Sequence, residues 1–286
     1  MARLTSLQQL SDSYFNDGDY HHAFLYKASI PSAGTATRWV DASMSSGIPK
    51  YNAYAGALLE SNQLIGSGNA GIFTGSTPSA GKYRYLARAG MGTISAVVPS
   101  YVMVLDYLLF YPLIDGDSTD QQDMTNSIGL PRYTDGKGVR AFIVATTPGT
   151  AEGNVTINYV SHDDTNQTVT FRILIGASTG VIINGTSGVS TSGNSPFIPL
   201  ASGSLGVKAI NSITNSSGLG GFYCIVLAKP LTTLNIYEQN TVSEVNFIND
   251  KFSIPRIYDG AYIHCIMKQG AAATGSYTGE FLFLTT

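Results

Sequence analysis

The acidic loop that begins at Asp115 is the first place in the sequence where side chains could do chemistry. Four aspartates fall close together on it: Asp115, Asp117, Asp120 and Asp123. Clustered carboxylates on a loop are the hard oxygen ligands that Ca²⁺ takes, but an EF-hand loop needs glycine sixth and glutamate twelfth. Here glycine stands second and Asn126 stands twelfth. Calcium is therefore a weak candidate, and the alternative is a loop followed by one helical turn with Asp117 as its N-cap.

A second short motif, Gly66 to Gly71, matches the G-x-G-x-x-G pattern of dinucleotide-binding loops. Such a loop must open a helix and be followed by an acidic residue that binds the ribose. Ile72 continues as a strand or turn, and no Asp or Glu occurs between Glu60 and Asp106. The motif therefore indicates a glycine-rich β-turn and predicts no nucleotide cofactor.

The remaining residues with metal-binding or nucleophilic chemistry are scattered: His21, His22, His162, His264, Cys224 and Cys265. Adjacent residues of a strand point to opposite faces, so His21 and His22 cannot both bind one ion from a regular strand. The same holds for His264 and Cys265. Both cysteines stand in apolar surroundings and are expected to be small buried side chains. With no G-x-S-x-G elbow either, the sequence predicts no enzyme activity, no metal and no cofactor.

The composition favours an all-β chain with neutral polar faces. Only 12% of the 286 residues are charged, against about 25% in ordinary globular proteins, while 43% are hydrophobic and 31 are glycines. A net charge of −3 gives no electrostatic footprint for nucleic acid or an anionic membrane. The longest apolar run, 102–111, is too short to span a bilayer, and no secretory signal is visible. We therefore expect neither nucleic acid nor membrane as a partner.

Three units are expected along the chain: an N-terminal arm (1–22), a first β-unit (23–150) and a second β-unit (151–286). In the arm, Leu4, Leu7 and Leu10 recur at helical spacing, and Ser6 begins a capping-box pattern. We predict that this short helix contacts another chain. Beyond it strand patterns take over, most clearly as a hairpin of 155–160 with 168–175, whose residues alternate between apolar and polar.

Two copies of one pattern, an apolar residue, Pro, Arg, two residues, Asp and Gly, suggest a duplicated β-unit. The shared residues are Pro131, Arg132, Asp135 and Gly136 in one copy, and Pro255, Arg256, Asp259 and Gly260 in the other. We expect each Asp-Gly to form a hairpin turn and the two arginines to brace their loops. Chance is the rival explanation, because Asp-Gly is a common hairpin sequence.

Four longer segments, 38–47, 106–124, 130–139 and 254–262, resemble a family of virion structural proteins of tailed bacteriophages. The resemblance implies a non-enzymatic particle component and transfers no catalytic residue. With the strand patterns, we expect an all-β fold, a β-sandwich or jelly roll with a short N-terminal helix.

The function expected from these observations is that of a capsid decoration (cement) or minor capsid protein, made in the cytoplasm of the bacterial host and located in the virion. Its partners would be capsid or other virion proteins, and it would act as a homo-oligomer, for which a trimer fits local threefold positions. Leu4, Leu7, Leu10 and Trp39 are the interface candidates. Two alternatives stay open: a tail or baseplate component, and a carbohydrate-binding receptor module built on exposed Tyr residues and Trp39.

Overall fold

The fold is all-β, as the sequence predicts. The computed structural model describes residues 6–16, 19–30, 38–66, 71–149, 151–174, 178–183, 195–250 and 253–286. Strands hold 50% of the residues and helices 5%. The helical segments are α1 (Leu7–Phe15), the 3₁₀ turn η1 (Ala42–Met44) and α2 (Phe247–Asp250).

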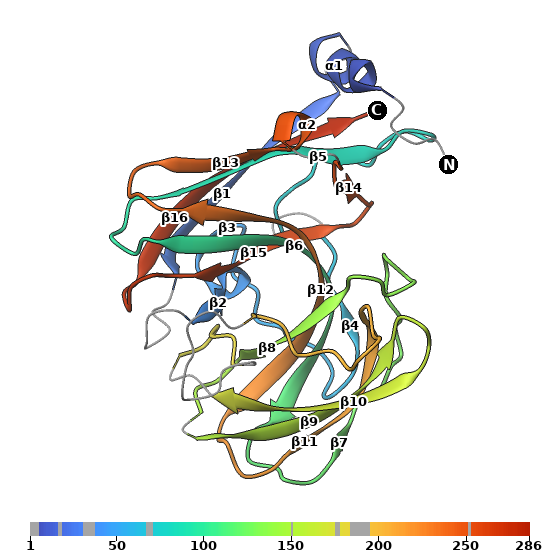
Figure 1. Ribbon diagram of the computed structural model, residues 1–286, viewed down its shortest axis with the longest axis vertical. Coiled ribbons are helices and arrows are strands. Elements are labelled where there is room, and N and C mark those ends of the chain that lie inside the picture. The colour runs from blue at the N-terminus through green and yellow to red at the C-terminus, as the bar shows by residue number, and fades with distance from the viewer. Residues whose placement is uncertain are drawn as a thin grey trace.

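The strands form three antiparallel sheets (Figure 1). Sheet A runs in the order β13 (Val242–Asn246), β5 (Arg84–Thr93), β16 (Gly275–Thr285), β1 (Tyr20–Ile30) and β3 (Gly47–Ile48), and β14 (Arg256–Ile257) also pairs with β5. Sheet B runs β2 (Trp39–Asp41), β15 (Tyr262–Lys268), β6 (Ser100–Asp115), β12 (Phe222–Ile236) and β8 (Arg140–Ala145), and β4 (Asn62–Gln63) pairs with β6. Sheet C runs β10 (Asn166–Leu174), β9 (Glu152–Ser161), β11 (Val207–Asn215) and β7 (Gln122–Asp123). The predicted hairpin is confirmed as β9 and β10.

Sheet B curls into a closed barrel. Residues 181–182 bridge its two ends, because Ile182 pairs with Val144 of β8 while Val181 pairs with Val40 of β2. Backbone hydrogen bonds complete the seam, including Ala145 N to the Val181 carbonyl at 2.9 Å and Ile182 N to the Trp39 carbonyl at 2.9 Å.

Alternation of side chains along the barrel strands creates two cores. On β12, Cys224 and Val226 belong to the cluster inside the barrel, while Tyr223 and Ile225 belong to the larger cluster outside it. That larger cluster also contains the inward faces of sheets A and C, for example Phe281 and Ile157. Sheet A occupies the upper part of Figure 1 and sheet C the lower part, with the barrel strands running between them.

The order of the strands relates the two ends of the molecule. In sheet A the order β13-β5-β16-β1 matches β7-β11-β9-β10 in sheet C, and in the barrel β15-β6 matches β8-β12. In this correspondence β5 matches β11, β6 matches β12, β7 matches β13, β8 matches β15 and β9 matches β16. The last strand, β10, matches β1, which comes first in the chain. The paired residues Leu109 and Leu227 lie 118 residues apart, which is also the spacing of the Pro-Leu sequences at 112 and 230. This strand order is the one expected if a duplicated β-unit had its last strand placed first in the chain.

The expected unit boundaries fall inside this arrangement. The one at 22/23 lies within β1, and the one at 150/151 lies between β8 and β9. Each sheet contains strands from both sides of 150/151. The two corresponding halves therefore exchange strands in space.

The N-terminal helix begins where the sequence predicts. Ser6 is its N-cap, and its hydroxyl accepts a hydrogen bond from Gln9 N at 3.4 Å. Leu4 lies outside the described residues, as do the side chains of Leu7 and Leu10. Among the parts of the chain that the structure describes, no helix is long and apolar enough to cross a membrane.

The helical turn expected near Asp117 is wrong. An irregular loop follows β6, and its carbonyl groups are bound from sheet C. The Asn215 side-chain amide donates to the carbonyls of Asp115 at 3.1 Å and Ser118 at 2.8 Å. Asp117 accepts from Gly220 N at 3.0 Å, so its carboxylate joins two loops instead of capping a helix.

Candidate functional site

The charged residue at the centre of the barrel, Asp41, is enclosed. Its carboxylate accepts hydrogen bonds from Ser43 N and Ser43 Oγ, both at 2.9 Å, and from the hydroxyls of Tyr107, at 2.9 Å, and Tyr54. Burial raises the pKa of Asp41 even though each of these donors favours the charged form. The residue lies at the junction of β2 and η1, where its carboxylate is the N-cap of η1. It acts as a structural centre of the barrel.

Two further titratable side chains near the barrel are buried without access from solvent. Lys27 Nζ donates to the carbonyls of Ser45 at 3.0 Å and Pro49 at 2.6 Å, and burial lowers the pKa of Lys27 to about 8. Burial also lowers the pKa of His264 well below its usual value, and its ring stacks on Tyr262. Both side chains are completely buried.

The two Pro-Arg sequences meet in space but use their arginines differently. Arg132 forms a buried ion pair with Asp106, with Nη2 2.7 Å from Oδ1 and Nε 2.9 Å from Oδ2. The Arg256 guanidinium lies over the rings of Tyr83, at 4.0 Å, and Tyr258, at 4.6 Å. Both arginines therefore brace their loops, one through charge and the other through aromatic contact.

The neighbouring motif residues form turns, and the expected hairpins are wrong. The strands flanking Asp135 and Gly136 lie in sheets C and B, and those flanking Asp259 and Gly260 lie in sheets A and B. Both glycines have positive φ, 71° at Gly136 and 70° at Gly260, as tight turns require.

The prolines of the two motifs precede contacts that join the sheets. The Pro255 carbonyl accepts from Leu86 N at 2.9 Å, next to the pairing of β14 with β5. Pro131 directly precedes Arg132, whose Nη1 donates to the Gly260 carbonyl at 3.1 Å. The two motifs thus contact each other.

The calcium candidates are not gathered into one site. Asp115 accepts from Asp117 N at 2.9 Å, and Asp123 accepts from the Gln121 side chain at 2.7 Å. Asp120 is exposed. Within the described ranges, no group of three or more His, Cys, Asp or Glu residues could hold a metal ion.

Gly66 and Trp39 both lie in packed surroundings. A Cβ at Gly66 would collide with the Ala261 carbonyl, so glycine there permits a close approach of two backbones; residues 67–70 lie outside the described residues. Trp39 is half-buried and packs against the core inside the barrel.

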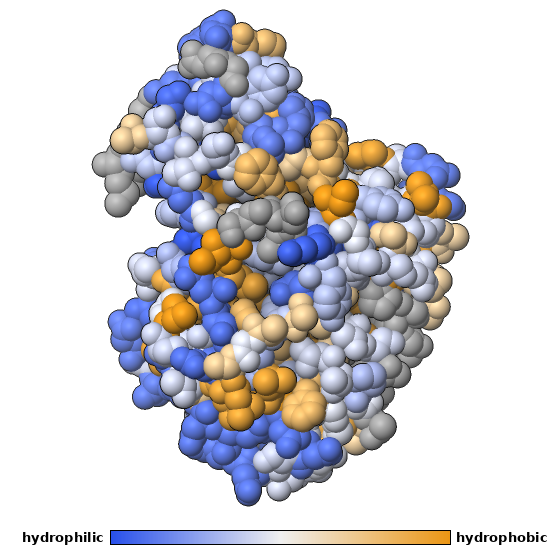
Figure 2. Space-filling model, turned by 180° about the vertical axis from the view of Figure 1, so that it is seen from behind, coloured by the Kyte–Doolittle hydropathy of each residue, from blue (hydrophilic) through white to orange (hydrophobic). Residues whose placement is uncertain are grey.

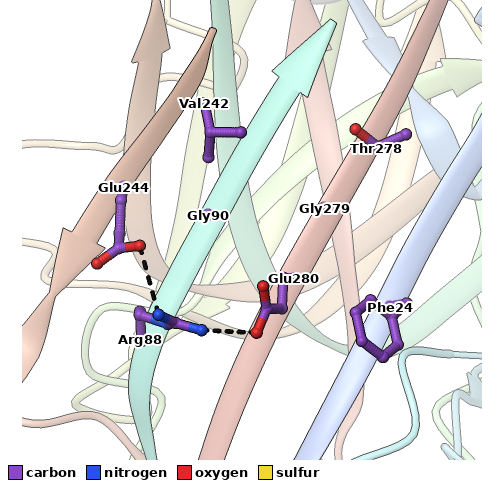
Figure 3. Close-up of a pocket in the computed structure, with 8 residues that line it drawn as sticks. All are labelled: Phe24, Arg88, Gly90, Val242, Glu244, Thr278, Gly279 and Glu280. Carbon is purple, nitrogen blue, oxygen red and sulfur yellow. Dashed lines mark hydrogen bonds and ion pairs between the residues drawn. The ribbon is translucent and has the colours of Figure 1, made fainter.

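A groove of about 240 Å³ on the outer face of sheet A is open to solvent (Figure 3). The register of the sheet aligns Glu244, Gly90, Glu280 and Phe24 in one row across β13, β5, β16 and β1. Val242, Gly92, Thr278 and Tyr26 form the next row. We call this feature, lined by Phe24, Arg88, Gly90, Val242, Glu244, Thr278, Gly279 and Glu280, the sheet A groove.

One guanidinium joins the carboxylates of the sheet A groove. Arg88 Nη2 lies 2.6 Å from Glu280 Oε1, and Arg88 Nη1 lies 3.7 Å from Glu244 Oε2. His22 Nδ1 lies 3.0 Å from the same Glu280 oxygen. The Arg88, Glu244 and Glu280 side chains are between 31% and 44% exposed, so a ligand could reach all three.

A wider hollow of about 560 Å³ adjoins the groove along β1. It is lined by 21–24, 47–50, Gly71 and Phe73. Three apolar side chains on its rim are exposed: Phe24 (65%), Ile48 (64%) and Phe73 (48%). The outer face of β1 is therefore the border between a charged groove and an apolar hollow.

Sequence reasoning missed the residues of the sheet A groove. Arg88 and Glu280 lie 192 positions apart, and no short motif contains either of them. The sequence signal that could have found them is weak: glycine occupies alternate positions, 90 and 92, within an apolar segment.

Comparison with known proteins adds little. No family model and no curated protein matches the chain. Among solved structures, the infectious bursal disease virus VP2 subviral particle aligns over 93% of this chain and 80% of that chain, with 8% identity and a TM-score of 0.18. The structure of the infectious bursal disease virus Gt strain aligns over the same shares with 9% identity and a TM-score of 0.17. These scores are too low to support an argument about fold or function.

Proposed function

We propose that this protein is a non-enzymatic structural component of a bacteriophage virion, acting as a capsid decoration or minor capsid protein. The observation that carries the proposal is the distribution of its side chains. The reactive groups Asp41, Asp106 and His264 are fully buried, whereas large apolar side chains such as Phe24 and Ile48 are exposed. A protein arranged in this way acts through contact.

The surface fits such a role. Figure 2 shows apolar side chains gathered in patches among weakly and strongly hydrophilic ones. Exposed aromatic and aliphatic groups supply the desolvated centre of protein interfaces, and a low charge reduces the cost of burying the rest. The resemblance of four sequence segments to tailed-phage virion proteins supports the same function. A homo-oligomer, such as a trimer, would multiply weak contacts with the capsid.

The test is to delete the gene for this chain from the phage, purify the particles and add the chain back. We expect saturable binding to the head, visible as added density by electron cryomicroscopy, and greater resistance of the particles to heat. Density on the tail would replace the decoration function by that of a tail or baseplate component. No binding to any part of the particle, together with binding to host glycans, would replace it by a receptor module.

A further inference from the structure

We propose that the sheet A groove binds one basic side chain, an arginine or a lysine, presented by a neighbouring protein of the particle. The inference rests on the proposed structural function and adds the chemistry by which the partner is recognised. It is carried by the shape of the groove, its charge and its apolar walls.

The glycine at the floor of the groove is not required by the fold. Its φ is not positive, and a Cβ at Gly90 would meet Val242 Cγ1 at 3.4 Å, an ordinary contact. Glycine inside a strand weakens a sheet and often marks a place where a ligand or another chain approaches closely. We infer that Gly90 keeps the floor open for an occupant.

The groove carries a surplus of negative charge. Two carboxylates, Glu244 and Glu280, face the one guanidinium of Arg88. Arg88 pairs closely with Glu280, at 2.6 Å, and loosely with Glu244, at 3.7 Å. Glu244 is therefore the weakly neutralised member, and it lies across the glycine floor from Glu280. An anionic ligand would be repelled, and a cation beside Glu244, which Arg88 reaches only at 3.7 Å, would balance the charge of the row.

The apolar members of the groove suit the rest of a basic side chain. Val242 is 64% exposed and lies in the row next to the charged one, and Phe24 is 65% exposed and lies at the β1 end of the charged row (Figure 3). Arginine and lysine bury their methylene stems on apolar surface, and their cations also bind the faces of aromatic rings. A bound arginine or lysine would place its methylene stem on Val242 and its cation near Glu244 or Phe24, and so would contact both the apolar and the charged side chains of the groove.

The size of the groove restricts the occupant to one side chain. Glu244 and Glu280 stand two strands apart, which sets their Cα atoms about 10 Å apart. A helix is itself about 10 Å across and cannot enter between them. We commit to a different protein that presents a basic side chain, because the charge of Glu244 and Glu280 is complementary to a cation.

The first experiment is a titration followed by amide NMR of the whole chain. The probe is N-acetyl-arginine amide, and the matched control is N-acetyl-citrulline amide, which has the same shape without the charge. We expect arginine to shift the amide signals of Gly90 and Gly279 with millimolar affinity, and citrulline to shift them at least tenfold more weakly. Equal shifts from both probes, or shifts from methyl glucoside and none from arginine, would overturn the proposal.

Variants then locate the binding. Glu244→Gln and Glu280→Gln should each weaken arginine binding at least fivefold, and Gly90→Val should abolish it by filling the floor. Thr170→Val, on the outer face of sheet C, is the control and should bind as the unaltered chain does. Unchanged binding by all three groove variants would place the arginine elsewhere and refute the assignment.

Attachment to particles separates this inference from the function on which it rests. If the proposal holds, the double variant Glu244→Gln/Glu280→Gln should bind depleted particles at least tenfold more weakly, and should remain folded by circular dichroism. Full attachment by the double variant would refute the groove as the docking site and leave the structural function intact. If the unaltered chain binds arginine but does not attach to particles, the structural function is refuted. If the unaltered chain associates with itself and the double variant does not, the groove binds a second copy, and the partner proposed here is refuted.

Discussion

Sheets A and C correspond in strand order, yet their outer faces differ. On sheet C, neutral side chains satisfy one another across the strands: Thr156 and Thr170 lie 2.8 Å apart, and Asn158 donates to Ser212 at 2.8 Å and accepts from Thr168 at 2.6 Å. These hydrogen bonds run from strand to strand and pair the polar side chains of the face with one another. Such a face stabilises its own sheet and offers little to a partner.

The outer face of sheet A is open instead of hydrogen-bonded, because β5 carries Gly90 between Glu244 and Glu280, where a larger side chain would fill the space. The charges around Gly90 are shared unequally, and Phe24 and Val242 remain exposed. The comparison shows one sheet whose outer polar groups bind one another and a corresponding sheet that leaves charged and apolar groups open to solvent. It also suggests that variants at corresponding positions will have unequal effects.

The largest inequality is expected between the two motif arginines. Replacing Arg132 by Met leaves Asp106 buried and unpaired, which should lower the free energy of unfolding by about 3–5 kcal/mol. Arg256→Met loses contacts with two tyrosine rings and should cost about 1–2 kcal/mol. Urea unfolding measures both. The double variant Arg132→Met/Asp106→Leu should recover much of the loss, and equal losses at the two arginines would contradict the difference in their environments.

A second inequality concerns the buried positions of the corresponding strands β1 and β10. Lys27 is completely buried on β1, whereas β10 buries Ile173. Because the pKa of Lys27 falls to about 8 in the folded chain, the unfolded chain binds more protons above pH 8 and stability must rise with pH. Taking an unfolded pKa near 10.4, the gain between pH 7 and 9.5 is about 2 kcal/mol.

The measurement is the free energy of unfolding of the chain and of Lys27→Met across this pH range. The variant should lose the rise between pH 7 and 9.5, because methionine does not titrate. Ile173→Val, on sheet C, should shift stability by about 1 kcal/mol at every pH and keep the rise. A rise that persists in Lys27→Met would assign the pH dependence to other groups.

How much of this the sequence predicts depends on how local each feature is. Alternating residues identify the β9–β10 hairpin, and Ser6 identifies the start of α1, because both signals involve neighbours in the chain. The Pro-Arg sequences are also visible, but the burial of Asp106 beside Arg132 is not, because 26 residues and two loops separate them.

Closure of the barrel lies beyond sequence patterns for the same reason. It depends on Val181 and Ile182 bridging β2, a strand of only three residues, to β8. The sheet A groove depends on the register of four strands drawn from both ends of the chain. Register is fixed by packing of whole sheets, so the row of Glu244, Gly90 and Glu280 becomes visible only in three dimensions.

The smallest expected effect compares two strand glycines, one in each sheet. Gly90→Ala should fit without displacement and raise the free energy of unfolding by about 0.5–1 kcal/mol, because alanine loses less backbone entropy on folding. Gly153→Ala on β9 should lower it by about 1 kcal/mol or more, because the new Cβ would lie 2.8 Å from both Leu219 Cδ2 and Ser217 Oγ. Thermal and urea unfolding of both variants measure these two changes in the free energy of unfolding. A loss of stability at Gly90→Ala would mean that the fold itself requires this glycine, and the open floor of the groove would then need no occupant to explain it.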